Sequence, residues 1–266
     1  MSVLLHISDP HFGTEQAPVV EALARFALQQ RPDLTVLSGD ITQRARPAQF
    51  QAARRFVDRL GTPVLAIAGN HDIPLLDLHA RLLAPHARQR AAFGDELEPV
   101  FSSTDLLVVC VNTTRRWRHK NGAVSAHQIE RAAQLLADAL STQLRLVVVH
   151  QPAEVERPQD VPDRLLGHEA ALRRWAEAGA DLVLGGHIHL PYVMAITRFA
   201  RPLWVVQAGT AVSSRVRAGI PNSVNLVRCG TAVVDGRCVI EQWDYAAENH
   251  AFECTKVTHV EPARGR

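Results

Sequence analysis

The sequence contains no apolar run near the length of about 18 residues that a membrane-spanning helix requires. Its first residues carry no basic leader, no long apolar stretch and no small-residue cleavage site. We therefore expect a cytoplasmic protein with no transmembrane segment. Only four cysteines are present, and no two form a Cys-x-x-Cys pair. Reduced thiols are expected, including Cys229 and Cys238, which flank a predicted hairpin.

An excess of charge of either sign is also missing, because Lys+Arg number 29 and Asp+Glu 27, a net charge of +2. A domain that binds duplex nucleic acid normally has a strongly basic balance, so no nucleic-acid duplex is expected as a partner. A disordered chain is excluded as well, since 47% of the residues are apolar. The residue type that is unusually frequent is histidine, with 13 positions.

Apolar runs alternate with helical patterns through the first part of the chain. This order predicts right-handed crossovers and a buried, mainly parallel sheet. The predicted strands lie at residues 3–8, 34–38, 64–68, 106–112, 144–150 and 182–185. The predicted helices lie at residues 17–30, 48–60, 74–90, 125–140 and 169–178, with Ser125 as an N-cap.

From Tyr192 the pattern changes to short runs, at residues 192–198, 203–208, 224–228, 231–234 and 238–244. The dipeptides Cys229-Gly230 and Asp235-Gly236 are typical of hairpin turns. We expect these runs to form a second sheet with antiparallel elements. Because no linker separates the two parts, residues 1–260 are predicted to be one domain in which two sheets pack face to face. Residues 261–266 are expected to be a frayed tail.

Five short motifs each sit at the C-terminal end of an apolar run. They are Asp9-Pro10-His11, Gly39-Asp40, Gly69-Asn70-His71-Asp72, His150 and Gly186-His187-Ile188-His189. Ligands of open α/β sheets bind beyond the carboxyl ends of the strands, so these residues should converge. Carboxylates, imidazoles and an amide without a thiolate suit Mn, Fe or Zn. The set is too large for one ion, whereas two ions that share a bridging carboxylate use all of it.

The ordered set from Asp9 to His189 resembles the calcineurin-like metallophosphoesterase superfamily. The resemblance implies an α/β fold, a four-layer α/β/β/α sandwich of two mixed sheets flanked by helices. It also implies a role for each motif residue. One metal would be held by Asp9, His11 and His189, and the other by Asn70, His150 and His187, with Asp40 bridging the two. His71 would face the substrate phosphate without binding metal, and Asp72 would orient the His71 imidazole.

Two divalent ions roughly 3.5–4 Å apart lower the pKa of a bridging water, so that hydroxide is available to attack phosphorus. The ions and His71 would stabilise the phosphoryl charge, and His71 is a candidate to protonate the leaving group. Each residue taken singly has an ordinary structural explanation, such as a turn residue, a cap or a strand-end histidine. The complete ordered set makes that explanation improbable.

Details of the motifs separate branches of the superfamily. Protein Ser/Thr phosphatases extend the second motif to G-D-x-x-D-R-G, whereas residues 39–45 read G-D-I-T-Q-R-A. With the protein phosphatases set aside, the sequence resembles bacterial class III cyclic-nucleotide phosphodiesterases and relatives that act on glycerophosphodiesters. Gln151 departs from many relatives, which have a histidine there. The Asp-Arg pair of that extension, which fixes an arginine beside the metals, reads Gln43-Arg44 here, with Arg44 the residue placed to stand in for it. We therefore expect a small phosphodiester to be preferred over a phosphomonoester.

Two alternatives stay open. Lipid-linked nucleotide-sugar pyrophosphatases typically have arginine at the position of His71, yet the apolar side of residues 74–90 suits an acyl chain. A non-catalytic scaffold of the same fold is disfavoured, because His71 and every metal ligand are present. A homodimer is compatible with the sequence. Two basic clusters, Arg115–Lys120 and Arg215 with Arg217, are either solvated or overhang the site, where an arginine would grip phosphate. Seven further histidines are expected to be solvated or core residues: His6, His79, His86, His127, His168, His250 and His259.

Overall fold

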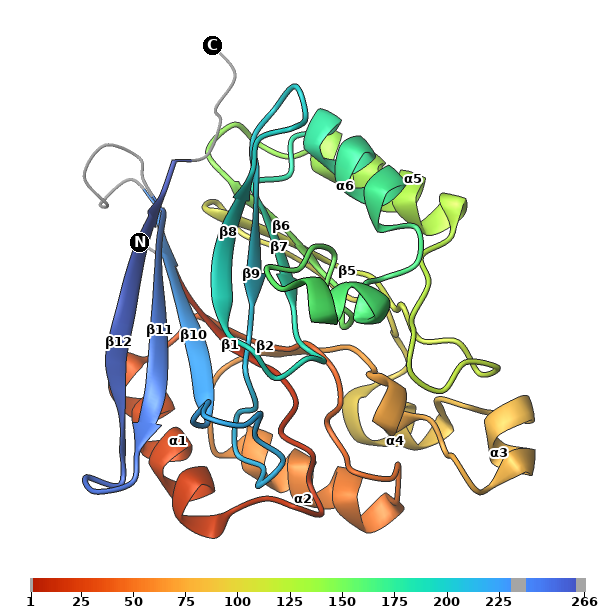
Figure 1. Cartoon of the computed structure of the whole chain (residues 1–266), viewed down its shortest axis with the longest axis vertical. Coiled ribbons are helices and arrows are strands. Elements are labelled where there is room, and N and C mark those ends of the chain that lie inside the picture. The colour runs from red at the N-terminus through yellow and green to blue at the C-terminus, as the bar shows by residue number, and fades with distance from the viewer. Residues whose placement is uncertain (1, 231–237, 262–266) are drawn as a thin grey trace.

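The computed structural model describes residues 2–230 and 238–261. The predicted run at 231–234, the dipeptide Asp235-Gly236 and residues 262–266 of the tail lie outside this range. Two six-stranded sheets pack face to face, with helices on their outer faces (Figure 1). The predicted α/β/β/α sandwich of two mixed sheets is therefore confirmed.

The first sheet has the strand order β12-β11-β10-β1-β2-β3. Its strands β1, β2 and β3 are parallel, and β10, β11 and β12 join them in antiparallel pairs. Their bounds are β1 Ser2–Ile7, β2 Leu34–Leu37, β3 Val64–Ala66, β10 Ser223–Cys229, β11 Cys238–Ala246 and β12 Ala251–Val260.

The second sheet has the strand order β4-β5-β6-β7-β9-β8. Strands β5, β6, β7 and β9 are parallel, and the antiparallel strands β4 and β8 form its edges. Their bounds are β4 Val100–Ser102, β5 Leu106–Cys110, β6 Leu144–Val148, β7 Leu182–Gly185, β8 Tyr192–Ile196 and β9 Leu203–Gln207.

The predicted division of the sheets at Tyr192 is wrong. The chain continues the second sheet with β8 and β9 and only then returns to the first sheet with β10. The reason is that β7 and β1 each have an open edge, which β9 fills in parallel and β10 in antiparallel pairing. Two strands were not predicted. Strand β4 has only three residues, and β12 is a mostly exposed edge strand without apolar alternation.

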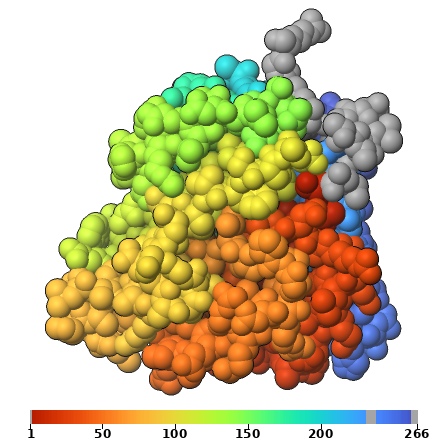
Figure 2. Space-filling view, turned by 180° about the vertical axis from the view of Figure 1, so that it is seen from behind, coloured from red at the N-terminus to blue at the C-terminus, as the bar shows by residue number. Residues whose placement is uncertain are grey.

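Seen from behind, residues of the N-terminal half cover most of the molecular face, and the last strands, in blue, appear at one side (Figure 2).

Helices cover the sheets on both outer faces. The first sheet packs against α1 (Ala17–Gln30) and α2 (Pro47–Asp58), and the second against α5 (Ala126–Ala137) and α6 (His168–Glu177). A third apolar core lies between the sheets. Ser125 is confirmed as the N-cap of α5, since its hydroxyl accepts a hydrogen bond from the Gln128 amide at 3.2 Å.

The predicted helix at residues 74–90 forms two short helices, α3 (Leu78–Leu83) and α4 (Ala87–Phe93). Proline at position 85 explains the break, because it lacks an amide hydrogen and disfavours helical geometry at the preceding residue. All four cysteines are reduced, as expected, and three of them are buried. Among the described residues, no helix combines the length and the apolar character needed to cross a bilayer.

Candidate metal centre

Every motif residue lies just beyond the carboxyl end of a parallel strand. Asp9 and His11 follow β1, Asp40 follows β2, and Asn70 and His71 form a single 3-10 turn, η1 (Asn70–Asp72), after β3. His150 follows β6, and His187 and His189 follow β7. Because β1 to β3 belong to one sheet and β6 and β7 to the other, the site lies where the ends of both sheets meet. The motifs therefore lie close together in the structure, as predicted.

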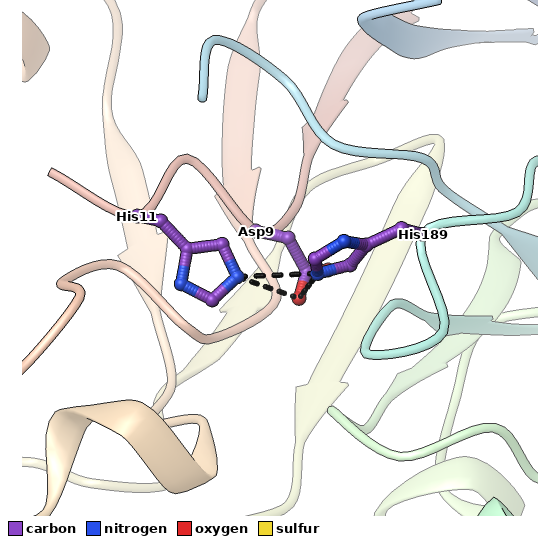
Figure 3. A group of neighbouring side chains, drawn as sticks. All are labelled: Asp9, His11 and His189. Carbon is purple, nitrogen blue, oxygen red and sulfur yellow. Dashed lines mark hydrogen bonds and ion pairs between the residues drawn. The ribbon is translucent and has the colours of Figure 1, made fainter. Parts of the chain in front are cut away.

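The first group of ligand atoms comes from Asp9, His11 and His189, which lie within 4.8 Å of one another (Figure 3). His189 Nε2 is 3.2 Å from Asp9 Oδ1 and 3.1 Å from His11 Nε2. Asp9 Oδ2 accepts hydrogen bonds from the Ser8 hydroxyl at 2.6 Å and from the His187 amide at 2.8 Å. Asp9 Oδ1 is buried and accepts none. A carboxylate oxygen left bare between two imidazoles is suited to a cation.

The second group comes from Asp40, His150 and His187. The His150 Nδ1 donates a hydrogen bond to the Ser38 carbonyl at 2.8 Å, which leaves Nε2 facing oxygens of Asn70 and Asp40, each at 3.3 Å. Both ring nitrogens of His187 are buried and have no hydrogen-bond partner among the residues that the structure describes. These orphaned atoms fit a metal ion, which would coordinate the free nitrogens while the main-chain carbonyl fixes the His150 ring.

Asp40 lies between the two groups. Its Oδ2 is 3.8 Å from His11 Nε2, and its Oδ1 is 3.3 Å from His150 Nε2. The Asp40 side chain is 2% exposed, so bulk water does not screen the negative charge of its carboxylate. Burial opposes ionisation of Asp40, but His150 and His11 hold its pKa well below the usual range. Asp40 is therefore a carboxylate that presents one oxygen to each group.

The charge state of the imidazoles suits metal binding. Burial lowers the pKa of His187 to about 4 and that of His11 to about 3, so both rings are neutral near pH 7. Burial also acts against protonation of His150, but the Asp40 carboxylate outweighs it and raises the pKa of His150 to about 9. A metal ion at His150 Nε2 would displace that proton.

The backbone of the ligand residues is left-handed. Asp9, His11, Asp40, His187 and His189 have φ angles of 51°, 43°, 49°, 74° and 55°. For residues other than glycine this conformation costs about 1–2 kcal/mol each. Eight non-glycine residues of the described chain have positive φ, and five of them are these ligands. Strain concentrated in this way is typical of functional sites.

Two glycines let the site form. A Cβ atom on Gly69 would overlap the Asp40 carboxylate, and one on Gly186 would overlap the Asp9 carboxylate and lie 2.8 Å from Ser8 Cβ. Because glycine has no Cβ, neighbouring loops of the site approach each other closely at these two positions.

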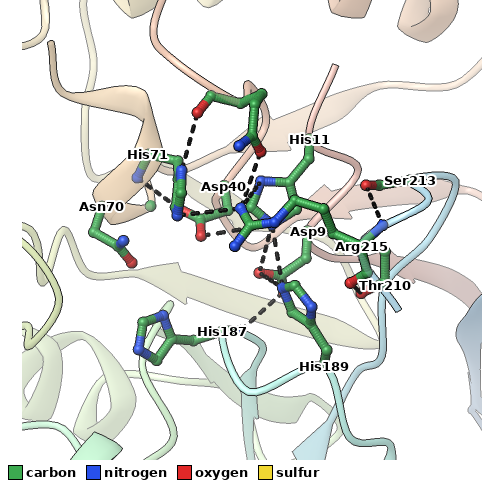
Figure 4. Close-up of polar contacts among 12 residues, drawn as sticks. Asp9, His11, Asp40, Asn70, His71, His187, His189, Thr210, Ser213 and Arg215 are labelled. Carbon is green, nitrogen blue, oxygen red and sulfur yellow. Dashed lines mark hydrogen bonds and ion pairs between the residues drawn. The ribbon is translucent and has the colours of Figure 1, made fainter. Parts of the chain in front are cut away.

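His71 is held beside the ligand groups. Its amide donates to Asp40 Oδ1 at 2.8 Å, and its Nδ1 donates to the Gln43 carbonyl at 3.0 Å. The remaining ring nitrogen, Nε2, lies 3.3 Å from Arg215 Nη1 (Figure 4). His11, Asp40 and His71 also form a group with ligand-like spacing. A metal at His71 Nε2 would compete with the arginine cation, which argues for His71 as a group that faces substrate.

The expected contact between Asp72 and the His71 ring is not formed. The Asp72 carboxylate accepts hydrogen bonds from the amides of Ile41, Thr42 and Gly69 at 3.0, 2.8 and 2.9 Å. These amides occupy both of its oxygens, and the Gln43 carbonyl takes the place that Asp72 was expected to fill. Asp72 therefore fastens the η1 turn to the loop after β2, and it acts on His71 only through the backbone.

A cavity of about 580 Å³ opens over the ligands, and residues from both basic clusters line it. In the first cluster, His119 and Lys120 line the cavity. Arg115 does not line it, and its Nη2 donates a hydrogen bond to Gln128 Oε1 at 2.6 Å. Gln151 is buried and donates to the Lys120 carbonyl at 3.2 Å, so it supports this loop. Arg215 and Arg217 also line the cavity. Of the two possibilities left open for Arg215 from the sequence, solvated or overhanging the site, the structure shows the second, and the expected preference for a diester over a monoester stays a prediction.

The comparisons with known proteins agree with this geometry. A family model described as Calcineurin-like phosphoesterase matches residues 2–191, which include every motif. A probable cyclic nucleotide phosphodiesterase of Synechococcus sp. is 29% identical over 190 residues, covering 68% of this chain and 67% of that protein. A glycerophosphodiester phosphodiesterase of Enterobacter lignolyticus is 40% identical over 83 residues, covering 26% of this chain and 29% of that protein. The chain therefore matches less than a third of the second relative.

Among solved structures, a dimetal phosphatase from Danio rerio superposes with a TM-score of 0.69 at 14% identity. The superposition covers 98% of this chain and 99% of that chain. At this identity the likeness shows a shared fold.

Proposed function

Because the chain belongs to the calcineurin-like phosphoesterase family, we propose that it is a dinuclear-metal phosphodiesterase that hydrolyses a small phosphodiester of the cyclic nucleotide or glycerophosphodiester type. One observation carries the proposal, namely two groups of ligand atoms with the Asp40 carboxylate between them. The names of the two relatives support the substrate class.

The donor set fits two divalent ions, with manganese, iron or zinc as candidates. The first ion would be held by Asp9, His11 and His189 and the second by Asn70, His150 and His187, with Asp40 contacting both. When bound, the ions would supply a hydroxide near neutral pH and neutralise charge on the phosphoryl oxygens.

The chain's own residues then position the substrate and the proton. The Gln43 carbonyl fixes the His71 ring at Nδ1, so Nε2 alone faces the cavity. A proton taken up by Nε2, in place of its contact with Arg215 Nη1, would be given to the leaving oxygen or would hold a phosphoryl oxygen. Asp72 and Gly69 keep the η1 turn against Asp40, which keeps His71 at a fixed distance from the bridging carboxylate.

A lipid-linked nucleotide-sugar pyrophosphatase is the second candidate, and one observation favours it. Four leucines on and before α3 are strongly exposed, and Leu76 and Leu83 are 88% and 70% accessible. The loop that carries His119 is fastened to this helix, because Arg116 Nη1 donates to the Leu82 carbonyl at 2.6 Å. An apolar surface beside the cavity suits an acyl chain. The leucines are Leu76, Leu78, Leu82 and Leu83.

A hydrolysis panel on the Mn²⁺-reconstituted protein tests the proposal. It contains cyclic nucleotides, glycerophosphodiesters, a lipid-linked nucleotide sugar, and the phosphomonoester p-nitrophenyl phosphate. We expect the highest kcat/KM on a water-soluble diester. A preference for the lipid-linked substrate would favour the second candidate, and no turnover with two bound ions would favour a scaffold. The cytoplasmic location, a homodimer and a domain boundary at residue 260 stay predictions.

A further inference from the structure

Arg215 is held in a fixed loop over the metal centre. The loop between β9 and β10 is joined to the segment that follows Asp9 and His11, through bonds from the Ser214 amide to the Thr14 carbonyl and between the Thr14 and Ser213 hydroxyls, both at 2.9 Å. Within the loop, the Arg215 amide donates to Ser213 Oγ at 2.9 Å (Figure 4). The position of the arginine is therefore set by the same chain segment that carries two ligands.

The guanidinium group of Arg215 has donors to spare. Its Nη1 meets Gln43 Oε1 at 2.9 Å and ring nitrogens of His11 and His71, each at 3.3 Å. Its Nε and Nη2 have no hydrogen-bond partner in residues 2–230 and 238–261. A guanidinium fork with free donors is suited to phosphoryl oxygens.

The charge of Arg215 is also uncompensated. Two other cations that line the cavity are paired, Lys120 with Asp163 at 2.5 Å and Arg217 with Asp160 at 3.0 Å. Arg215 makes no ion pair with a carboxylate in the described part of the chain. A half-buried cation without an anion beside it favours an anionic ligand at that place.

The contacts of Arg215 with the two histidines are weak ones. Three acceptors surround Nη1, which carries two hydrogens: Gln43 Oε1 lies at 2.9 Å, and the nitrogens of His11 and His71 each lie at 3.3 Å. A phosphoryl oxygen, which carries charge, is a stronger acceptor than either ring nitrogen and would replace these contacts.

We propose that Arg215 binds the phosphoryl oxygens of the substrate through its free guanidinium donors, and that its charge sets how well the site accepts a dianionic phosphomonoester relative to a diester. This inference rests on the proposed function only in its statement about diesters. A monoester dianion carries one more negative charge than a diester, so it depends more strongly on the arginine.

The test compares Arg215→Gln, which removes the charge, with Arg215→Lys, which keeps it. Arg217→Gln is the matched control, since this arginine lies in the same loop and is already paired with Asp160. Three quantities are measured: Mn²⁺ binding to metal-free protein by calorimetry, affinity of the Mn²⁺ protein for inorganic phosphate, and the ratio of kcat/KM for p-nitrophenyl phosphate to that for bis(p-nitrophenyl) phosphate.

For Arg215→Gln we expect two ions bound as tightly as in wild type, because Arg215 belongs to neither ligand group. Phosphate affinity should fall by about tenfold or more, and the monoester-to-diester ratio should fall about as much. Arg215→Lys should recover the ratio to within about threefold, and Arg217→Gln should leave the ratio unchanged.

Loss of metal in Arg215→Gln would overturn the proposal, since Arg215 would then support His11 structurally. Unchanged phosphate affinity and an unchanged ratio would also overturn it, as would a Mn²⁺ protein that binds no phosphate. If wild type hydrolyses no diester but its phosphate affinity still depends on Arg215, the proposed function fails and the role of Arg215 stands.

Discussion

Replacing Gly186 by alanine tests whether the first ligand group needs the close contact between the loops after β1 and β7. A Cβ atom at this position would overlap Asp9 Oδ2 and lie 2.8 Å from Ser8 Cβ. Rotation of the serine hydroxyl cannot relieve the second contact, because Cβ does not move when the hydroxyl rotates. The loop after β7 must therefore shift away from Asp9.

The shift would break the hydrogen bond from the His187 amide to Asp9 Oδ2. The added Cβ would also overlap the Ser8 hydroxyl and turn it away from Asp9 Oδ2, which would break the second hydrogen bond. Hydrogen bonds to a charged group contribute about 1.5–3 kcal/mol each. Overpacking adds roughly 1–3 kcal/mol, and partial relaxation returns some of the total. We expect the free energy of unfolding to fall by about 3–5 kcal/mol, together with loss of the ion held by Asp9, His11 and His189.

Urea denaturation of the metal-free protein and Mn²⁺ titration by calorimetry measure both effects. Gly61→Ala is the control, because Gly61 has φ of +68° and open space around its Cβ position. Its free energy of unfolding should fall by about 1–2 kcal/mol only, the cost of alanine in the left-handed conformation, and it should keep both ions. If the free energy of unfolding of Gly186→Ala fell by less than about 1 kcal/mol and two ions were still bound, the reasoning would be refuted.

Three further predictions concern other parts of the account. His71→Ala should keep its metals by elemental analysis but lose kcat by roughly 10²–10⁴, and loss of metal instead would make His71 a ligand. Burial lowers the pKa of His86 to about 4, so the unfolded chain binds more protons there than the folded chain. Between pH 6.5 and 4 the free energy of unfolding of wild type should therefore fall by about 3 kcal/mol more than that of His86→Gln, measured by urea denaturation. Chelation of ions present at about 100 times their Kd should cost about 2.7 kcal/mol per ion and lower the Tm by several degrees, whereas an unchanged Tm would argue against resident ions.

The positions of the ligands were predictable from the sequence because strand ends are local features. Asp9, Asp40 and His150 each end an apolar run, and parallel strands place their carboxyl ends at one edge. The hydrogen bond from His150 Nδ1 to the Ser38 carbonyl, in contrast, joins residues that are far apart in the chain. No spacing in the sequence encodes such a pairing.

The features that the sequence did not predict depend on main-chain atoms or on long-range pairing. Gln43 orients His71 with its carbonyl, and a carbonyl is present in every residue type. Arg215 reaches His71 from a loop whose path is set by which sheet β10 joins, and that choice was predicted wrongly. The break of the helix at 74–90 was predictable, because the proline at position 85 is visible in the sequence.

The metal content of Asp40→Ala tests the central claim most directly. Wild type, Asp40→Ala and the control Asp160→Ala are reconstituted with Mn²⁺, freed of excess metal and measured by elemental analysis. Asp160 lines the same cavity but is paired with Arg217, so its loss should not affect the ions. We expect two ions per chain in wild type and in Asp160→Ala, and fewer than about half an ion in Asp40→Ala, because both groups lose their shared carboxylate. Two ions retained by Asp40→Ala, or a single ion in wild type, would contradict a centre bridged by Asp40.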